Sequence, residues 1–153
     1  MDIFVTDLEL MQAALAQARA AETAGEVPIG TVIFHEGQII ARGQNRVLRD
    51  NDPTAHAEIV ALRTAAHAIG NYRLTGCTLV STLEPCAMCA GAVIHARVDR
   101  LLFAADDSKA GAAGSVLSLL NHPALNHQLI VDRGLLAEDS ATLLREFFQR
   151  RRG

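Results

Sequence analysis

Residues 77–96 read CTLVSTLEPCAMCAGAVIHA, a stretch that begins as a strand and ends as a helix. The run from Cys77 to Thr82 is short and apolar, as expected for a buried strand. Pro85 suits the first turn of a helix, and the residues after it keep helical character to about Ala96. This stretch therefore predicts one strand and one helix of an α/β domain.

The segments on either side predict further helices and strands. Thr6 and Glu9 form a capping-box pattern before an amphipathic helix that stops at Gly25. Two β-prone runs, 29–35 and 38–43, flank a Glu-Gly turn and predict a hairpin. We also expect a helix over 54–68 that stops at Gly70, strands over 98–104 and 128–131, a short helix over 117–120, and a last helix over 139–151.

Together these elements predict a single domain covering residues 1–153. Because helices alternate with the strands, we expect them to cover both faces of a mixed five-stranded sheet. This arrangement is a three-layer α/β/α fold. Half of the residues are hydrophobic, only 4% are aromatic and Trp is absent, so we expect a core of Ala, Val, Ile and Leu.

Composition also indicates the environment of the chain. No apolar run approaches the roughly 18 to 20 residues that cross a bilayer, and the N-terminus lacks a basic stretch followed by an apolar one. We therefore expect a cytoplasmic protein with no membrane partner. Its three cysteines, two of them spaced as C-x-x-C, do not make a disulfide framework and favour metal or redox chemistry.

The distribution of charge leaves two interpretations open. The net charge of -3 argues against a polyanionic partner, but four arginines fall within the last nine positions: Arg145, Arg150, Arg151 and Arg152. Such a cluster can contact the phosphates of a nucleic acid. It is equally typical of a solvated helix end, where arginines complement the negative end of the helix dipole.

The C-x-x-C pair lies at the start of a predicted helix. Cys86 and Cys89 are three positions apart there and share one face, and the free amides of a helix start lower the pKa of a thiol. Both sulfurs can then serve a metal as thiolates. Taken alone, the motif also fits a redox pair, half of a structural zinc site, or two buried small residues.

A second motif, His56-Ala57-Glu58, falls at the start of the preceding helix. Side chains in a first turn tilt toward the helix start, so two helix starts at the ends of adjacent strands bring these groups together. His56, Cys86 and Cys89 supply three zinc ligands and leave one position for water, which indicates a catalytic site. Glu58 would take and pass on a proton of that water, although a first-turn glutamate also merely complements the helix dipole.

The combination of H-x-E with P-C-x-x-C resembles the signature of the zinc-dependent nucleobase deaminases. A narrower resemblance covers nearly the whole chain, and points to the bacterial tRNA-specific adenosine deaminases, which convert the wobble adenosine of an anticodon to inosine. The segments that carry it are 52–58 (DPTAHAE), 71–74 (NYRL), 82–94 (TLEPCAMCAGAVI), 111–115 (GAAGS), and Phe147-Phe148 with the arginines after them.

The resemblance implies a cytidine deaminase-like fold, one Zn²⁺ per chain held by His56, Cys86 and Cys89, and Glu58 as the catalytic proton carrier. It further implies a tRNA anticodon stem-loop as partner and a homodimer as the assembly. The residues it assigns to substrate binding are Asn45, Asp107, His122 and Phe148.

Two of these positions carry a second observation. Asn45 on its own is also typical of a turn. Asp106, beside Asp107, stands where the resemblance leads us to expect a basic residue.

Two other functions remain open at this point. A small-molecule deaminase acting on guanine or a free nucleoside would share the zinc chemistry and lack an RNA channel. A non-catalytic zinc-binding module would keep the ligands and make no use of Glu58. Cys77, inside an apolar strand, is expected in the core and outside any site.

Overall fold

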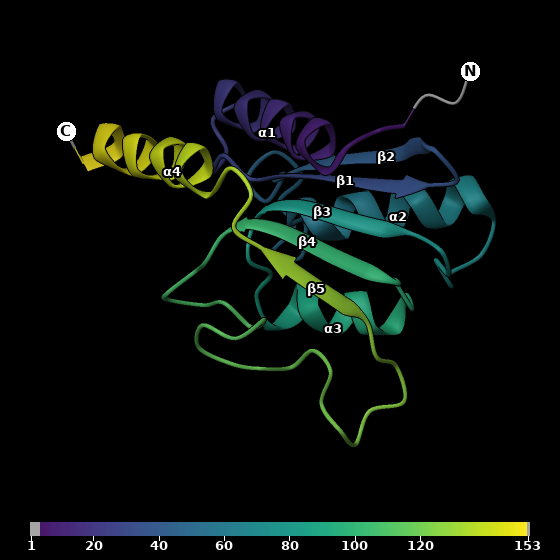
Figure 1. Cartoon of the computed structure of the whole chain (residues 1–153). Coiled ribbons are helices and arrows are strands. Elements are labelled where there is room, and N and C mark those ends of the chain that lie inside the picture. Colours follow the sequence, from purple (N-terminus) through teal and green to yellow (C-terminus); the bar gives the residue numbers. More distant parts are fainter. Residues whose placement is uncertain (1–3, 153) are drawn as a thin grey trace.

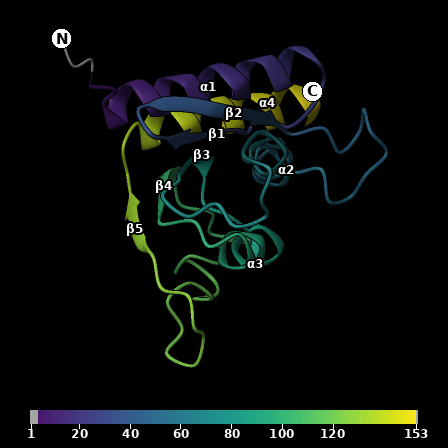
Figure 2. The same cartoon turned by 90° about the vertical axis from the view of Figure 1, so that its right-hand side faces the viewer.

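The computed structural model describes residues 4–152 as three layers, with a sheet between two pairs of helices (Figure 1). Along the chain the elements are α1 (Asp7–Thr23), β1 (Gly30–His35), β2 (Gln38–Gln44), α2 (Ala57–Ile69), β3 (Thr78–Leu83), α3 (Ala87–His95), β4 (Arg100–Ala105), β5 (Ile130–Arg133) and α4 (Ala137–Arg152). Helices α1 and α4 cover one face of the sheet, and α2 and α3 cover the other (Figure 2). The predicted three-layer fold is confirmed.

The sheet is mixed, and its five strands run in the order β2-β1-β3-β4-β5. Strand β1 pairs antiparallel with both β2 and β3, whereas β3, β4 and β5 are parallel. The pairings Gly30 with Gln44 and Leu83 with Ala105 bring the ends of β2, β3 and β4 to one edge of the sheet. The polar segments that follow these strands therefore begin close together.

The predicted hairpin joins β1 to β2 through Glu36 and Gly37. Both residues have positive φ, 49° and 81°, as in the turn type that matches the twist of paired strands. The predicted cap of α1 is also present, because the Thr6 hydroxyl accepts from the Glu9 amide at 3.1 Å.

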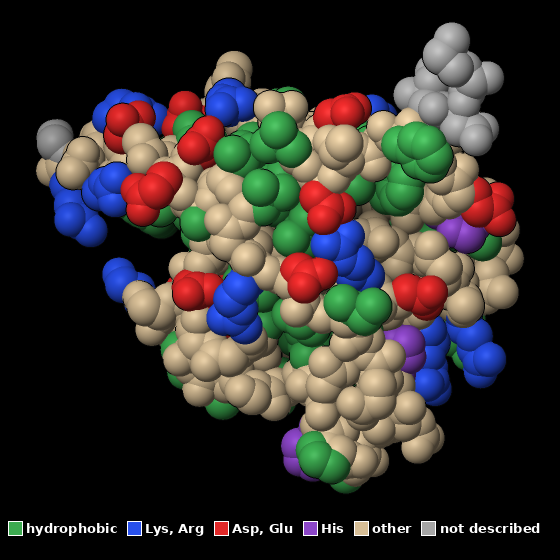
Figure 3. All heavy atoms as spheres, in the orientation of Figure 1, with side chains coloured by type: hydrophobic (Ala, Val, Ile, Leu, Met, Phe, Trp, Pro, Cys, Tyr) green, Lys and Arg blue, Asp and Glu red, His purple; other side chains and the backbone are tan. Residues whose placement is uncertain are grey.

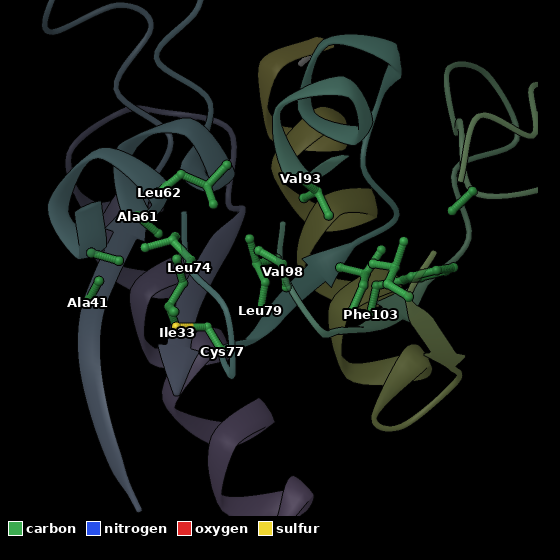
Figure 4. Close-up of a cluster of buried hydrophobic side chains, with 14 residues drawn as sticks. Ile33, Ala41, Ala61, Leu62, Leu74, Cys77, Leu79, Val93, Val98 and Phe103 are labelled. Atoms are coloured by element: carbon green, nitrogen blue, oxygen red, sulfur yellow. The ribbon is translucent and has the colours of Figure 1, made fainter. Parts of the chain in front are cut away.

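Two apolar cores lie on opposite faces of the sheet, because successive strand residues point to opposite sides. Val32, Val80 and Leu102 pack with Met11, Leu15 and their neighbours on α1. Ile33, Leu79 and Phe103 pack under α2 and α3, in the cluster that contains Leu62 and Val93 (Figure 4). Cys77 lies in this second cluster with no exposed surface, as expected for a core cysteine.

Glycines allow two helices to lie directly on the strands. A Cβ at Gly43 of β2 would fall 2.3 Å from the carbonyl oxygen of Ala57, and one at Gly30 of β1 would fall 2.0 Å from that of Ala14. The backbone at Ala57 or Ala14 could make room for such a Cβ only if the whole helix moved. Gly43 thus fixes the start of α2, which carries the H-x-E motif, close against the sheet.

The bounds of several predicted elements differ in the structure; α4, for example, begins at Ala137 and not at Asp139. Three further differences have an identifiable cause. Helix α2 starts at Ala57 and not at Thr54, because residues 46–56 form a hydrogen-bonded loop before it. Strand β5 begins at Ile130, since the Leu129 amide is taken by the side chain of Asn121. The short helix over 117–120 is absent: the Leu117 amide donates to the Gly111 carbonyl, and Ser118 forms an isolated bridge with Ala113.

The C-terminal helix is held against α1 by two of its arginines. Arg150 pairs with Glu22 at 2.8 Å, and Arg151 donates to the carbonyl of Gly25 at 2.7 Å. The guanidinium of Arg151 also lies over the ring of Phe147. Figure 3 shows Lys and Arg side chains gathered at this end of α4. Part of the basic cluster therefore has a structural role.

Within residues 4–152, no helix is both long and apolar enough to span a membrane.

Candidate active site

The two motifs meet because each lies at a helix start on the same edge of the sheet. His56 is the N-cap residue of α2 and Cys86 is the N-cap residue of α3, both with extended backbone. The Nδ1 atom of His56 lies 3.6 Å from the Sγ of Cys86 and 3.6 Å from the Sγ of Cys89. All three potential ligand atoms lie within 4.8 Å of one another.

These distances fit a tetrahedral zinc ion. With a sulfur at about 2.3 Å and a nitrogen at about 2.0 Å from the metal, tetrahedral angles place the two ligand atoms about 3.5 Å apart. Two sulfurs and one imidazole are also the donors that zinc takes in such sites. Within residues 4–152 the cluster holds three ligands, so a bound zinc would keep a position open for a small molecule.

The donor set also has the charge that a cation requires. Hydrogen bonds from Cys89 and His56 lower the pKa of Cys86 to about 3. The neighbouring Cys86 thiolate and burial raise the pKa of Cys89, and the same thiolate raises that of His56. Without a cation, these shifts favour one thiolate and one thiol in the pair. Binding a metal would release the remaining proton.

Glu58 lies in the first turn of α2 beside this cluster, and its side chain is only 4% exposed. Burial raises the pKa of its carboxyl to about 7, partly offset by its own backbone amide and by His56. A carboxyl with a pKa near 7 can both accept and donate a proton at neutral pH. A glutamate that only complements the helix dipole would not need to be buried, whereas Glu58 is buried beside the cluster.

A second buried carboxylate, Glu84, was not foreseen from the sequence. It directly precedes Pro85 and accepts hydrogen bonds from the amides of Asp107 at 3.0 Å, Ala113 at 2.9 Å and Ser115 at 3.1 Å. The Ser115 hydroxyl donates to it as well. We call residues 106–115 the substrate loop; Glu84 binds this loop to the segment that carries Cys86. The one available signal is a glutamate at the end of an apolar strand.

Replacing Glu84 by glutamine should lower the free energy of unfolding at pH 7 by about 2 to 4 kcal/mol, because buried amides lose a charged acceptor. Hydrogen bonds hold the pKa of Glu84 below its usual value, against the effect of burial. This stabilisation is present above the ordinary carboxyl pKa and is lost as the pH falls through the lower folded value. Urea unfolding at pH 7 and at pH 3 should show the difference shrinking in acid.

The control for that experiment is Glu36→Gln, since Glu36 lies on the hairpin turn with a side chain that is 83% exposed. It should change stability by less than about 0.5 kcal/mol at either pH. Equal stability of the Glu84→Gln variant and the wild type at pH 7 would contradict the anchoring role.

Two adjoining cavities open at the edge of the sheet where β3 and β4 end. The larger, of about 680 Å³, is lined by the substrate loop, including Asp107 and Lys109, and by Arg145 and Phe148 of α4. The smaller, of about 360 Å³, is lined by Asn45, Glu26 and Phe148 among others. Phe148 and Val27 border both cavities. We call these two adjoining cavities together the groove. Three of the four expected substrate-binding residues line it: Asn45, Asp107 and Phe148.

The fourth residue, His122, lies apart. It sits in the exposed loop before β5, where its Nδ1 accepts from the Ala124 amide at 3.0 Å, and it lines neither cavity. Asp106 lines the larger cavity but is paired with Arg133 at 3.2 Å. Asp107 accepts from the amides of Lys109 and Ala110, so its carboxylate also shapes the loop.

Asn45 is fixed by a network that centres on Glu26, which is 1% exposed. Glu26 accepts from the amides of Leu48 and Arg49 and from the guanidinium of Arg49. Arg49 in turn donates to the Asn45 carbonyl at 2.7 Å. The Asn45 side chain accepts from the Val47 amide, so the expected turn geometry is present together with a position on the groove.

The fold and the His-Cys-Cys cluster define a zinc-binding deaminase of the α/β/α class. Residues 5–105 match the profile of the cytidine and deoxycytidylate deaminase zinc-binding region. The chain belongs to this family and, within it, to the tRNA-specific adenosine deaminases. It is a hydrolytic deaminase.

The assignment within the family rests on likeness along nearly the whole chain. The tRNA-specific adenosine deaminase of Haemophilus influenzae is 48% identical over 147 residues, which cover 95% of this chain and 85% of that protein. A solved tRNA:A34 deaminase matches with a TM-score of 0.85 at 45% identity, over 88% of this chain and 98% of its own. The guanine deaminase of Nitrosomonas europaea matches with a TM-score of 0.82 at 32% identity, over 95% and 86%.

Proposed function

We propose that this protein converts adenosine to inosine at the wobble position of a tRNA anticodon, in the cytoplasm, with one zinc ion per chain. The observation that carries the proposal is the groove at the end of the sheet, which is bordered by Arg145, Lys109 and Phe148. Leu83, which also lines it, ends β3 three positions before Cys86. A tRNA-specific relative at 48% identity supports the same substrate.

The reaction follows from the residues at the cluster. His56, Cys86 and Cys89 would hold the zinc ion, which when bound acts as a Lewis acid and lowers the pKa of water toward about 7. Glu58 takes a proton from the attacking water and delivers it to N1 of the adenine ring. The same carboxylate then takes the remaining proton from the new hydroxyl group at C6 and gives it to the amine, so that the C6–N bond breaks, ammonia leaves and the ring keeps a carbonyl oxygen at C6.

The groove has the chemistry of a single-stranded RNA site. Phe148 is 44% exposed and offers a face for base stacking, while Arg145 and Lys109 are cations for flanking phosphates. A base in an anticodon loop is already unpaired, so turning it into the site costs little. Asn45 lines the neighbouring cavity, and we expect it to contact the turned nucleotide.

The test is to incubate the zinc-loaded protein with an anticodon stem-loop carrying a wobble adenosine and, in parallel, with free adenosine, cytidine and guanine. We expect inosine in the RNA and no ammonia from the free compounds. Binding of the stem-loop should weaken by at least about tenfold between 50 and 200 mM salt, because phosphate contacts release counterions. A flat salt response or ammonia from free guanine alone would refute the RNA substrate.

The second candidate is a guanine deaminase, which the structural match at 32% identity favours. It shares the zinc chemistry and predicts release of ammonia from the free base. The parallel incubation above separates the two functions directly.

We also propose that the protein forms a homodimer. Helices α2 and α3 share an apolar groove of about 390 Å³, lined by Leu62, Ala66, Tyr72 and Ala92 among others. Tyr72 is 65% exposed at its rim. Sedimentation at micromolar concentration should show a dimer, and Ala92→Arg should shift it to monomer; a wild-type protein that sediments only as a monomer would refute the assembly.

A further inference from the structure

The substrate loop, residues 106–115, is held from two sides. Glu84 binds its backbone from within, through the amides of Asp107, Ala113 and Ser115. On the outer side it meets the edge strand β5, whose last residue is Arg133. The parallel connection from β4 to β5 contains no helix, so backbone hydrogen bonds and contacts from neighbouring elements, β5 among them, hold the loop.

Arg133 touches the loop at both of its ends. Its Nη1 lies 3.2 Å from Oδ1 of Asp106 at the beginning, and its Nη2 donates to the carbonyl of Ala113 near the end. One planar guanidinium therefore joins two points of the loop, which a lysine could not do with the same geometry.

The guanidinium is itself held in place. Its central carbon lies 4.8 Å from the centre of the Phe103 ring, which is fully buried and pairs in register with Arg133. Gly114 has φ +128°, and a Cβ there would come within 3.0 Å of Nη2. The loop therefore leaves room for the guanidinium at the point where it reaches the carbonyl.

These contacts also account for the acidic residue at position 106. Where a basic residue was expected, Asp106 carries a negative charge that Arg133 offsets. Its role is then within the protein, and the neighbouring Lys109 and Arg145 remain the cations of the cavity.

We propose that Arg133 is a positioning residue for deamination: by joining Asp106 to Ala113 it sets the placement of Asp107 and of the cavity wall that contacts RNA. This inference rests on the proposed RNA substrate. The loop carries none of the three zinc ligands, so loosening it should weaken RNA binding and leave the chemical step nearly unchanged. KM should rise while kcat stays close to the wild-type value.

The experiment compares Arg133→Met, Asp106→Asn and the double variant, all zinc-loaded, on the anticodon stem-loop. Arg133→Met should raise KM by about tenfold, as for loss of about 1.4 kcal/mol from a charge-assisted hydrogen bond, with kcat within about twofold. The double variant should be no worse than Arg133→Met, since the two residues act as one unit. Arg133→Lys keeps the charge and one contact, so its KM should lie between those of the wild type and Arg133→Met.

The matched control is Asp132→Asn, which removes an ion pair from the same strand: Asp132 pairs with Arg100 at 2.9 Å, away from the loop. Hydrogen exchange supplies a readout besides activity, because loop amides should exchange faster in Arg133→Met and not in Asp132→Asn. Wild-type KM in a folded Arg133→Met, or equal changes in the control, would overturn the inference. If the wild-type protein leaves RNA unchanged, the proposed substrate fails, and the exchange comparison still decides whether Arg133 anchors the loop.

Discussion

The Glu58→Gln variant should lose at least about a thousandfold in kcat on the anticodon stem-loop, within the range that positioned acid-base groups contribute. Glutamine keeps the size of the side chain but can neither accept nor release a proton near neutral pH. Because Glu58 is not one of the three clustered ligands, zinc content should stay at the wild-type level. Single-turnover rates together with metal analysis of the same preparation measure both quantities.

This variant separates an enzyme from a non-catalytic zinc-binding module. A module would bind its partner equally well with or without Glu58, and would show no turnover to lose. Glu36→Gln makes the same chemical change on an exposed turn and should keep full activity. A Glu58→Gln protein that deaminates at the normal rate would exclude Glu58 as the proton carrier.

The second large effect is expected from Cys89→Ser, which should abolish both stoichiometric zinc binding and detectable deamination. Cys89 is fully buried and contributes one of the two sulfurs, and serine is a much poorer ligand for zinc at this position. Metal that binds only the folded chain also stabilises it, by about 4 kcal/mol at a thousand times its Kd. Both the variant and a chelator-treated wild type should therefore unfold at lower temperature.

The matched control is Cys77→Ala, which removes the third thiol from the apolar core and leaves the cluster untouched. It should lose some stability while keeping one zinc per chain and wild-type kcat. Adding zinc back to the chelated wild type should restore activity and melting temperature, and should not rescue Cys89→Ser. Full activity of Cys89→Ser would remove this cysteine from the site.

The sequence predicted the elements whose signals are local. The cap at Thr6 and the turn at Glu36-Gly37 depend on neighbouring residues, and both are present as expected. The error at 117–120 has the opposite origin: apolar residues there suggested a helix, but Leu120 packs against the core beneath α3 and the backbone bonds to residues 111–113. Tertiary contacts decided that segment, and no local pattern records them.

The same distinction applies to the site. His56, Glu58 and the two cysteines are recognisable because zinc ligands fall at fixed spacing at helix starts. Glu84 is not, because its partners lie in a loop that is distant in sequence. Arg133 is still harder to recognise from the sequence, since nothing in its own strand indicates that its side chain reaches Asp106. Residues that support a site across the fold become visible only when the chain is assembled.

The caps of α2 and α3 have a consequence for attempts to make this protein more heat-resistant. His56 and Cys86 occupy cap positions but form no side-chain cap hydrogen bond, whereas Thr6 caps α1. Introducing serine or aspartate at such positions commonly adds about 0.5 to 2 kcal/mol of stability. In this protein, a redesign for stability would choose these two positions first, and both substitutions would remove residues that we propose to bind the metal. Stabilising substitutions therefore have to be sought away from these two helix starts.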